Sequence, residues 1–161
     1  MRTYNDTAPF RVVQRETKVD DADDEIQVEG HKPQIPDGTY LARYVGHDTA
    51  ILFGMRAHKV FLRFEICEGE YQGIRLFRPY RVRRVTKSGT NGKFILSAGG
   101  DLYRMLARVL DVKTRPDRIS IRAMRTMVFS VTTKTIKKDR EDRALGPGAW
   151  YSVIDAVEDG R

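Results

Sequence analysis

Apolar and polar residues alternate along much of the chain after Gly38, which is the pattern of half-buried β-strands. The clearest example is "HKVFLRFEIC", residues 58–67, where every second residue is apolar and the residues between are mostly charged. Successive side chains of a strand point to opposite faces, so one face is predicted to meet a core and the other solvent. Strands are predicted by this pattern at 39–45, 58–67, 74–85, 125–135 and 149–157.

A helical period replaces the alternation in "DLYRMLARVL", residues 101–110. Leu102, Met105 and Leu106 recur at the spacing that places them along one helical stripe. Asp101 follows two glycines and is expected to cap the helix N-terminus. Polar, glycine-containing or charged segments predict connections at 68–73, 86–93 and 137–148.

Three strands, a helix and two further strands follow one another in that order. It is the order of the five-stranded Greek-key OB barrel. The predicted fold is therefore mainly β, an OB-fold-like barrel with one helix between strands three and four. This domain is expected to span residues 38–161.

Residues 1–37 differ in composition from the rest of the chain. Residues 17–37, "TKVDDADDEIQVEGHKPQIPD", are acidic and poor in large apolar side chains, which predicts a flexible arm because too little surface can be buried to offset the ordering entropy. The earlier "FRVVQRE", residues 10–16, is a short apolar patch that could add an edge strand. Two roles stay open for the arm: it competes with a polyanion for the basic domain, or it is a solvated linker that makes no contacts.

The two strands at 58–67 and 74–85 carry cations and aromatics on the face predicted to lie away from the core. Phe61 and Phe77 are the aromatics of that face, and Pro79 predicts an edge position or a bulge because it cannot donate a ladder hydrogen bond. The alternative is that both rings belong to the core and the arginines form a solvated face. The candidate nucleic-acid-binding residues are Lys59, Phe61, Arg63, Arg75, Phe77, Arg81, Arg83 and Arg84, with Lys87 and Lys93 in the following loop.

Charge narrows the choice of partner. The chain has 161 residues and a formal net charge of +7, although its first 37 residues are acidic overall. A strongly basic domain attracts polyanions, most often nucleic acid and less often anionic membrane.

Other chemistry has little support in the sequence. Cys67 is the single cysteine, which excludes an internal disulfide, and no Cys/His cluster has zinc spacing. His31, His47 and His58 are scattered without a nucleophile or paired carboxylate at catalytic spacing, so each is expected to be solvated or hydrogen-bonded. No enzyme, metal or cofactor is therefore predicted. The absence of a long apolar run and of a signal-peptide core favours a soluble, cytoplasmic protein that does not enter membranes.

A resemblance to a family adds to this picture. The segments "PDGTYLARYV", "KVFLRFEICEGEYQGIRLF" and "GAWYSVIDAVE" resemble the OB-fold single-stranded-DNA-binding proteins of phages and mobile genetic elements. The shared hairpin pattern falls on Leu62, Phe64, Ile66, Gly69, Gly73, Leu76 and Phe77. The final residues "DAVEDGR" differ from the acidic, hydrophobic-tipped tail of bacterial housekeeping single-strand binders, so recruitment of repair enzymes through such a tail is not expected.

The sequence thus favours a single-stranded-DNA-binding protein with little sequence preference. The resemblance implies a role in replication, recombination or transfer of a phage or mobile element, together with replication or recombination proteins. Two alternatives stay open: an RNA-binding protein, and a protein-interaction module whose basic face docks an acidic partner. Monomeric and homo-oligomeric forms are equally compatible with the pattern.

Overall fold

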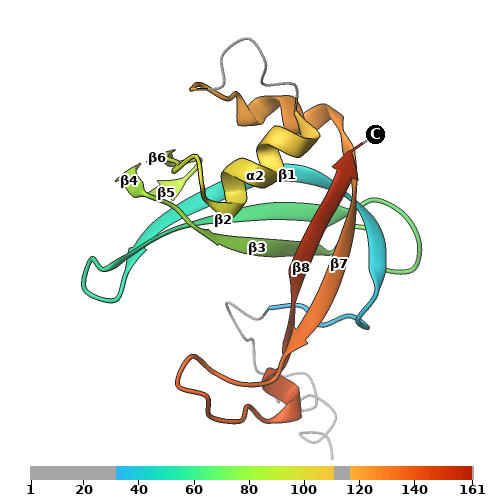
Figure 1. Cartoon of the computed structure of the whole chain (residues 1–161). Coiled ribbons are helices and arrows are strands. Elements are labelled where there is room, and N and C mark those ends of the chain that lie inside the picture. Colours follow the sequence, from blue (N-terminus) through green and yellow to red (C-terminus); the bar gives the residue numbers. More distant parts are fainter. Residues whose placement is uncertain (1–31, 111–116, 161) are drawn as a thin grey trace, which may run out of the picture. The chain divides into compact units, whose positions relative to one another are not determined.

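The computed structural model describes residues 32–110 and 117–160, and it confirms a mainly β protein with an antiparallel sheet (Figure 1). Neighbouring strands pair in the order β3-β2-β1-β7-β8. Residues 1–31 of the predicted arm, including "FRVVQRE", lie outside the described residues. The strands of this order are β1 (Thr39–Leu52), β2 (Ala57–Ile66), β3 (Arg75–Arg81), β7 (Val128–Ile136) and β8 (Tyr151–Gly160).

The two strands at the ends of this order, β3 and β8, also contact each other. The guanidinium of Arg78 on β3 donates a hydrogen bond to the Ile154 carbonyl of β8, with a donor–acceptor distance of 3.4 Å. The same guanidinium lies over the Tyr80 ring, 4.9 Å from its centroid. Side chains therefore join strands that the main ladder leaves apart.

The first strand is longer than predicted. The sequence placed its end at residue 45, but β1 continues to Leu52. A bulge between Tyr44 and Gly46 shifts the register against β2, so the alternation changes phase there and the later half looks irregular in sequence. Gly46 has a φ of 149°, a conformation that side chains with a Cβ rarely adopt.

The predicted third strand at 74–85 is two strands, which corrects that prediction. The β3 strand ends at Arg81, and β4 (Arg84–Lys87) pairs instead with β6 (Lys93–Ile95) in a second, two-stranded sheet. The chain leaves β2 because the Arg83 amide bonds to the Ile95 carbonyl. The predicted loop at 86–93 is thus largely a hairpin, and its short β5 (Gly89–Thr90) pairs with β1.

The helix prediction is confirmed by α2 (Asp101–Val109), whereas its capping was predicted wrongly. Gly100 occupies the N-cap position with no side-chain cap hydrogen bond, and Asp101 lies in the first turn. The predicted strand at 125–135 begins at Val128 because η1 (Ile121–Thr126) precedes it with Met124 buried. Similarly, η2 (Pro147–Ala149) delays the start of the last strand to Tyr151.

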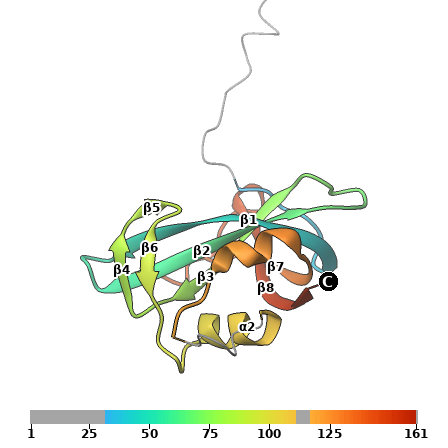
Figure 2. The ribbon, with the colours of Figure 1, turned by 90° about the horizontal axis from the view of Figure 1, so that it is seen from above.

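The core lies on the face of β2 that the sequence predicted. Val60, Leu62, Phe64 and Ile66 are all buried, with Phe64 only 1% exposed. The α2 helix and the β4–β6 hairpin lie on this side of the sheet (Figure 2). The opposite face of β2 and β3 is therefore left uncovered by these elements.

Residues 32–37, which the sequence assigned to the arm, pack against the start of β8. The Ile35 side chain is buried, and the Ile35 amide donates to Ser152 Oγ at 2.8 Å. The Ser152 amide in turn donates to the Pro33 carbonyl at 2.9 Å. This segment is consequently part of the folded unit.

Candidate nucleic-acid interface

The predicted site residues of β2 and β3 share one face of the sheet. We call this surface the β2–β3 outer face. Cross-strand partners lie directly opposite each other on the same side, and the ladder keeps one register along its whole length, through Pro79. Pro79 lies on β3, a terminal strand of the ladder, which agrees with the predicted edge position and gives no bulge. The β2–β3 outer face consists of Lys59, Phe61, Arg63 and Glu65 on β2 and of Arg75, Phe77, Pro79 and Arg81 on β3.

The two aromatic rings of this face touch. Phe61 and Phe77 have ring centroids 5.6 Å apart and an interplanar angle of 71°, an edge-to-face arrangement. Both side chains are half-buried, in contrast to the buried Phe64 of the opposite face. The alternative that both rings belong to the core is thus excluded. An edge-to-face pair leaves ring surface on which another planar group can stack.

Two arginines of the outer face are held by carboxylates of the same face. Arg75 Nε donates to Glu65 Oε1 at 2.9 Å. Arg63 Nε lies 3.3 Å from Asp48 Oδ2 on β1, although within the described residues this buried nitrogen has no aligned hydrogen-bond acceptor. The four side chains of these two ion pairs are nevertheless partly exposed. Such ion pairs contribute about 0–1 kcal/mol, so a phosphate can replace either carboxylate at small cost.

Lys59 and Arg81 form the cationic end of the outer face. They are direct cross-strand partners at the end of the β2–β3 ladder nearest the β1–β2 turn. Among the described residues neither has a carboxylate within ion-pairing distance. Both cations are therefore available to an anion.

The remaining predicted site residues lie elsewhere. Arg84, Lys87 and Lys93 belong to the β4–β6 hairpin, in which the two lysines face each other across the strands. That hairpin packs over the core side of β2, because the Val85 amide donates to His58 Nδ1 at 3.0 Å. Arg83 borders a hollow of about 480 Å³ between the end of β3 and the start of α2. The predicted cations thus lie on the outer face, on the β4–β6 hairpin and, for Arg83, at the border of this hollow.

Sequence reasoning missed Lys32 and Tyr151 at the outer face. Lys32 Nζ lies 5.3 Å from the Phe77 centroid and 4.4 Å from the Tyr151 centroid. The ammonium group thus joins an aromatic of β3 to one at the start of β8. No local pattern could have shown this, because the three residues are far apart in the sequence.

The two loops that connect β1 with β2 and β7 with β8 also meet. The Arg140 guanidinium carbon lies 4.6 Å from the Phe53 ring centroid. In the second loop Lys137 Nζ lies 4.7 Å from the Trp150 centroid, and Trp150 Nε1 donates to the Leu145 carbonyl. These aromatic–cation pairs were missed, although the charged run at 137–148 was a signal for the second loop.

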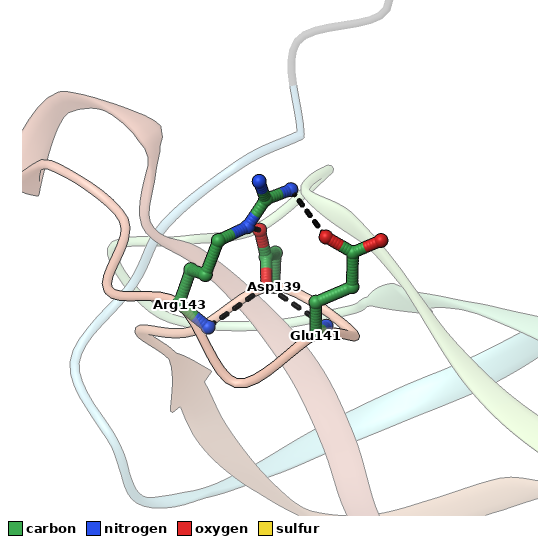
Figure 3. Close-up of polar contacts among 3 residues, drawn as sticks. All are labelled: Asp139, Glu141 and Arg143. Carbon is green, nitrogen blue, oxygen red and sulfur yellow. Dashed lines mark hydrogen bonds and ion pairs between the residues drawn. The ribbon is translucent and has the colours of Figure 1, made fainter.

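The loop that presents Arg140 is organised around one carboxylate (Figure 3). Asp139 accepts hydrogen bonds from the amides of Glu141 and Arg143 and pairs with the Arg143 side chain at 2.9 Å. These hydrogen bonds, led by the Arg143 amide, lower the pKa of the Asp139 carboxyl. Arg143 also pairs with Glu141 at 2.7 Å.

Two of the histidines have structural hydrogen bonds, as expected, and His31 lies outside the described residues. His47 Nε2 lies 2.8 Å from the Gly92 carbonyl, so this nitrogen carries the proton and Nδ1 accepts from Tyr44 Oη at 2.9 Å. Burial raises the pKa of Tyr44 to about 12, which keeps its hydroxyl a donor. These hydrogen bonds, from Tyr44 through His47 to Gly92, connect the β4–β6 hairpin to β1.

No family model, curated protein or solved structure matches the chain. Within residues 32–110 and 117–160, no group of His, Cys, Asp and Glu side chains is arranged to hold a metal ion. None of the helices in these ranges is long and apolar enough to cross a membrane.

Proposed function

We propose that the protein binds single-stranded DNA on the β2–β3 outer face, with little sequence preference. The observation that supports this most directly is the half-buried Phe61–Phe77 pair on the outer face, with cations beside it. Bases stack on aromatic side chains for about 1–3 kcal/mol each, and every base has a ring face to stack. Guanidinium and ammonium groups meet the phosphates without reading the base.

We further propose that the described domain is an OB fold. The ladder order β3-β2-β1-β7-β8, the contact between β3 and β8, and the helix before β7 support this assignment. OB folds bind oligonucleotides with strands two and three and with the loops that join strands one to two and four to five. In this chain those loops contain Phe53 and Arg140.

The β4–β6 hairpin is an addition to the five strands of an OB fold. It carries Lys87 and Lys93 away from the outer face, so these lysines are not part of the proposed site. The bound strand instead contacts Lys59 and Arg81 directly, and it draws Arg63 and Arg75 from their carboxylate partners. A role in replication, recombination or transfer of a phage or mobile element follows from the family resemblance of the sequence.

Fluorescence anisotropy with labelled oligonucleotides tests the proposal. Single-stranded DNA should bind more tightly than a duplex of the same length, because stacking needs unpaired base faces. Single-stranded RNA of the same sequence should be measured in parallel to separate DNA from RNA preference. Affinities should be compared at two salt concentrations, since phosphate contacts weaken as salt rises.

Equal affinity for single-stranded and duplex DNA would indicate contacts to phosphate alone and would overturn the stacking mechanism. Tighter binding to RNA would favour the RNA-binding alternative. Absence of binding to every oligonucleotide at low salt would favour the docking of an acidic partner protein on the same cations.

A further inference from the structure

The turn between β1 and β2 presents two large apolar side chains to solvent. Phe53 is 48% exposed and Met55 is 75% exposed. Among the described residues the other large apolar side chain with comparable exposure is Ile95, at 47%, on the separate β4–β6 hairpin. Soluble proteins rarely place such groups together at a tip unless they contact a partner.

The backbone of this tip is held in an unusual conformation. Phe53, Gly54 and Met55 have φ values of 54°, 64° and 70°, all in the left-handed region that favours glycine. The Arg56 amide closes the turn by donating to the Leu52 carbonyl at 3.1 Å. Non-glycine residues in this region are strained, and such strain is concentrated at functional positions. Both the exposure and the strain are unfavourable in the free protein.

A cation supports the ring at the tip. The Arg140 guanidinium stacks on Phe53, and the loop that bears it is fixed by Asp139. The tip also carries Arg56, which is exposed. A planar apolar group with cations beside it fits a base pair and its phosphates better than it fits an apolar protein surface.

The tip continues the track of the β2–β3 outer face. From the turn, β2 runs from Ala57 past Lys59 to Phe61, and Lys59 and Arg81 form the end of the ladder nearest the turn. A single strand that stacks on Phe61 and runs along β2 would therefore leave the face at the tip. A duplex continuing from that strand would meet Phe53 and Met55 first.

We propose that the β1–β2 tip is a wedge that opens duplex DNA at a junction with single-stranded DNA. Phe53 and Met55 would insert against the last base pair and replace its stacking, as apolar wedges do when they unstack base steps. The strand released at the junction would then pass onto the outer face. This inference rests on the proposed single-strand binding and adds strand separation to it.

A forked duplex with a fluorophore and a quencher at the junction tests the wedge. Its single-stranded tail should be about 10 nucleotides, within the range that one OB fold occupies. The tip variant is Phe53→Gly with Met55→Gly, because glycine suits the left-handed backbone and should preserve folding. Ile95→Gly is the matched control, since it removes an exposed apolar side chain elsewhere. Affinity for the isolated tail and thermal unfolding are measured for each protein.

At equal occupancy of the tail, the tip variant should open the fork about 5-fold to 150-fold less than the wild type, the range expected for the loss of one stacked base. Its affinity for the isolated tail should fall far less than its opening of the fork does, because the Phe61–Phe77 pair and the cations of the outer face are intact. Ile95→Gly should open the fork like the wild type.

The wedge would be overturned if the tip variant opened the fork as well as the wild type, or if it lost tail affinity and opening in equal measure. Wild-type binding of the tail without any opening of the fork would also overturn it, while leaving the proposed function intact. Failure of the wild type to bind the tail would instead overturn the proposed function. If thermal unfolding shows that the tip variant has not folded, Met55→Ser, at the more exposed position, is measured against the same outcomes.

Discussion

Phe61 and Phe77 are large aromatic side chains that the core does not enclose. Their rings contact each other on the outer face. Phe64, on β2 like Phe61, packs against Tyr44 and Phe129 on the core side of the sheet. Substitutions on the outer face and in the core should therefore affect different properties of the protein. Stability should depend on the inner ring and ligand affinity on the outer rings.

Phe61→Ala and Phe77→Ala should each weaken binding of single-stranded DNA by about 1–3 kcal/mol, the value of one stacked base. The melting temperature should change little, because both side chains are already partly solvated. Phe64→Ala is the control and should lower the free energy of unfolding by about 3–5 kcal/mol. Anisotropy and thermal denaturation measure the two effects. A large loss of stability in Phe61→Ala with unchanged affinity of the folded fraction would show that this ring serves the fold.

At the scale of elements, alternation in the sequence correctly predicted β2 and its two faces. The reason is that β2 keeps one register along residues 59–63, both with β1 and with β3. The prediction failed where the register changes. Because of the bulge at Gly46, the second half of β1 was not predicted as a strand. Residues 74–85 were predicted as one strand, although the chain leaves β2 at Arg83. Pairing partners decide both features, and partners are not visible in a local pattern.

The candidate site shows the same limit. The outer-face residues of β2 and β3 could be predicted because each strand alternates by itself. The contacts of Lys32 with Phe77 and of Arg140 with Phe53 could not, since each joins segments far apart in the chain. The polar composition of 86–93 likewise gave no sign that its lysines would be carried to a different surface.

The β4–β6 hairpin depends on the absence of a side chain at Gly92. A Cβ at this position would overlap Thr49 Oγ1 and the Lys87 carbonyl oxygen, and these two atoms are hydrogen-bonded to each other at 2.7 Å. Gly92→Ala should therefore lower the free energy of unfolding by about 1–3 kcal/mol, as other overpacking substitutions do. Thermal denaturation measures it.

Gly99→Ala is the matched control for this prediction, because a Cβ at Gly99 would have no atom within 4 Å. It should leave the melting temperature nearly unchanged. Equal melting temperatures for the two variants would show that the hairpin can move away from β1 without loss of stability, contrary to the contacts described.

At the scale of the whole molecule, most of the cations predicted to bind nucleic acid lie either on the outer face or on the β4–β6 hairpin. The formal net charge of +7 alone would let any basic surface attract DNA. The Phe61–Phe77 pair lies on the outer face, so the proposed stacking of bases favours that surface over the β4–β6 hairpin. The two cation groups should therefore differ in how they affect the dependence of affinity on salt.

Lys59→Ala and Arg81→Ala should each flatten the plot of log affinity against log salt by about 0.7, the slope per phosphate for a single strand. Lys87→Ala and Lys93→Ala are the controls and should leave the slope near the wild-type value. Titrations of single-stranded DNA at several salt concentrations give these slopes. Equal flattening by all four substitutions would show that DNA contacts both surfaces and that stacking does not select between them.

The contacts of Lys32 with two aromatic rings affect how the proposed site would discriminate among ligands. In the free protein the ammonium group of Lys32 covers the Phe77 and Tyr151 rings. A nucleotide of the proposed single strand would replace both contacts. Its base would stack on the ring in place of the ammonium group, and its phosphate would pair with the ammonium group in place of the ring. The free energy needed to separate Lys32 from the rings is the same whichever base arrives. In the proposed binding of single-stranded DNA, this free energy would lower affinity by the same amount for every sequence and would contribute nothing to discrimination among the four bases.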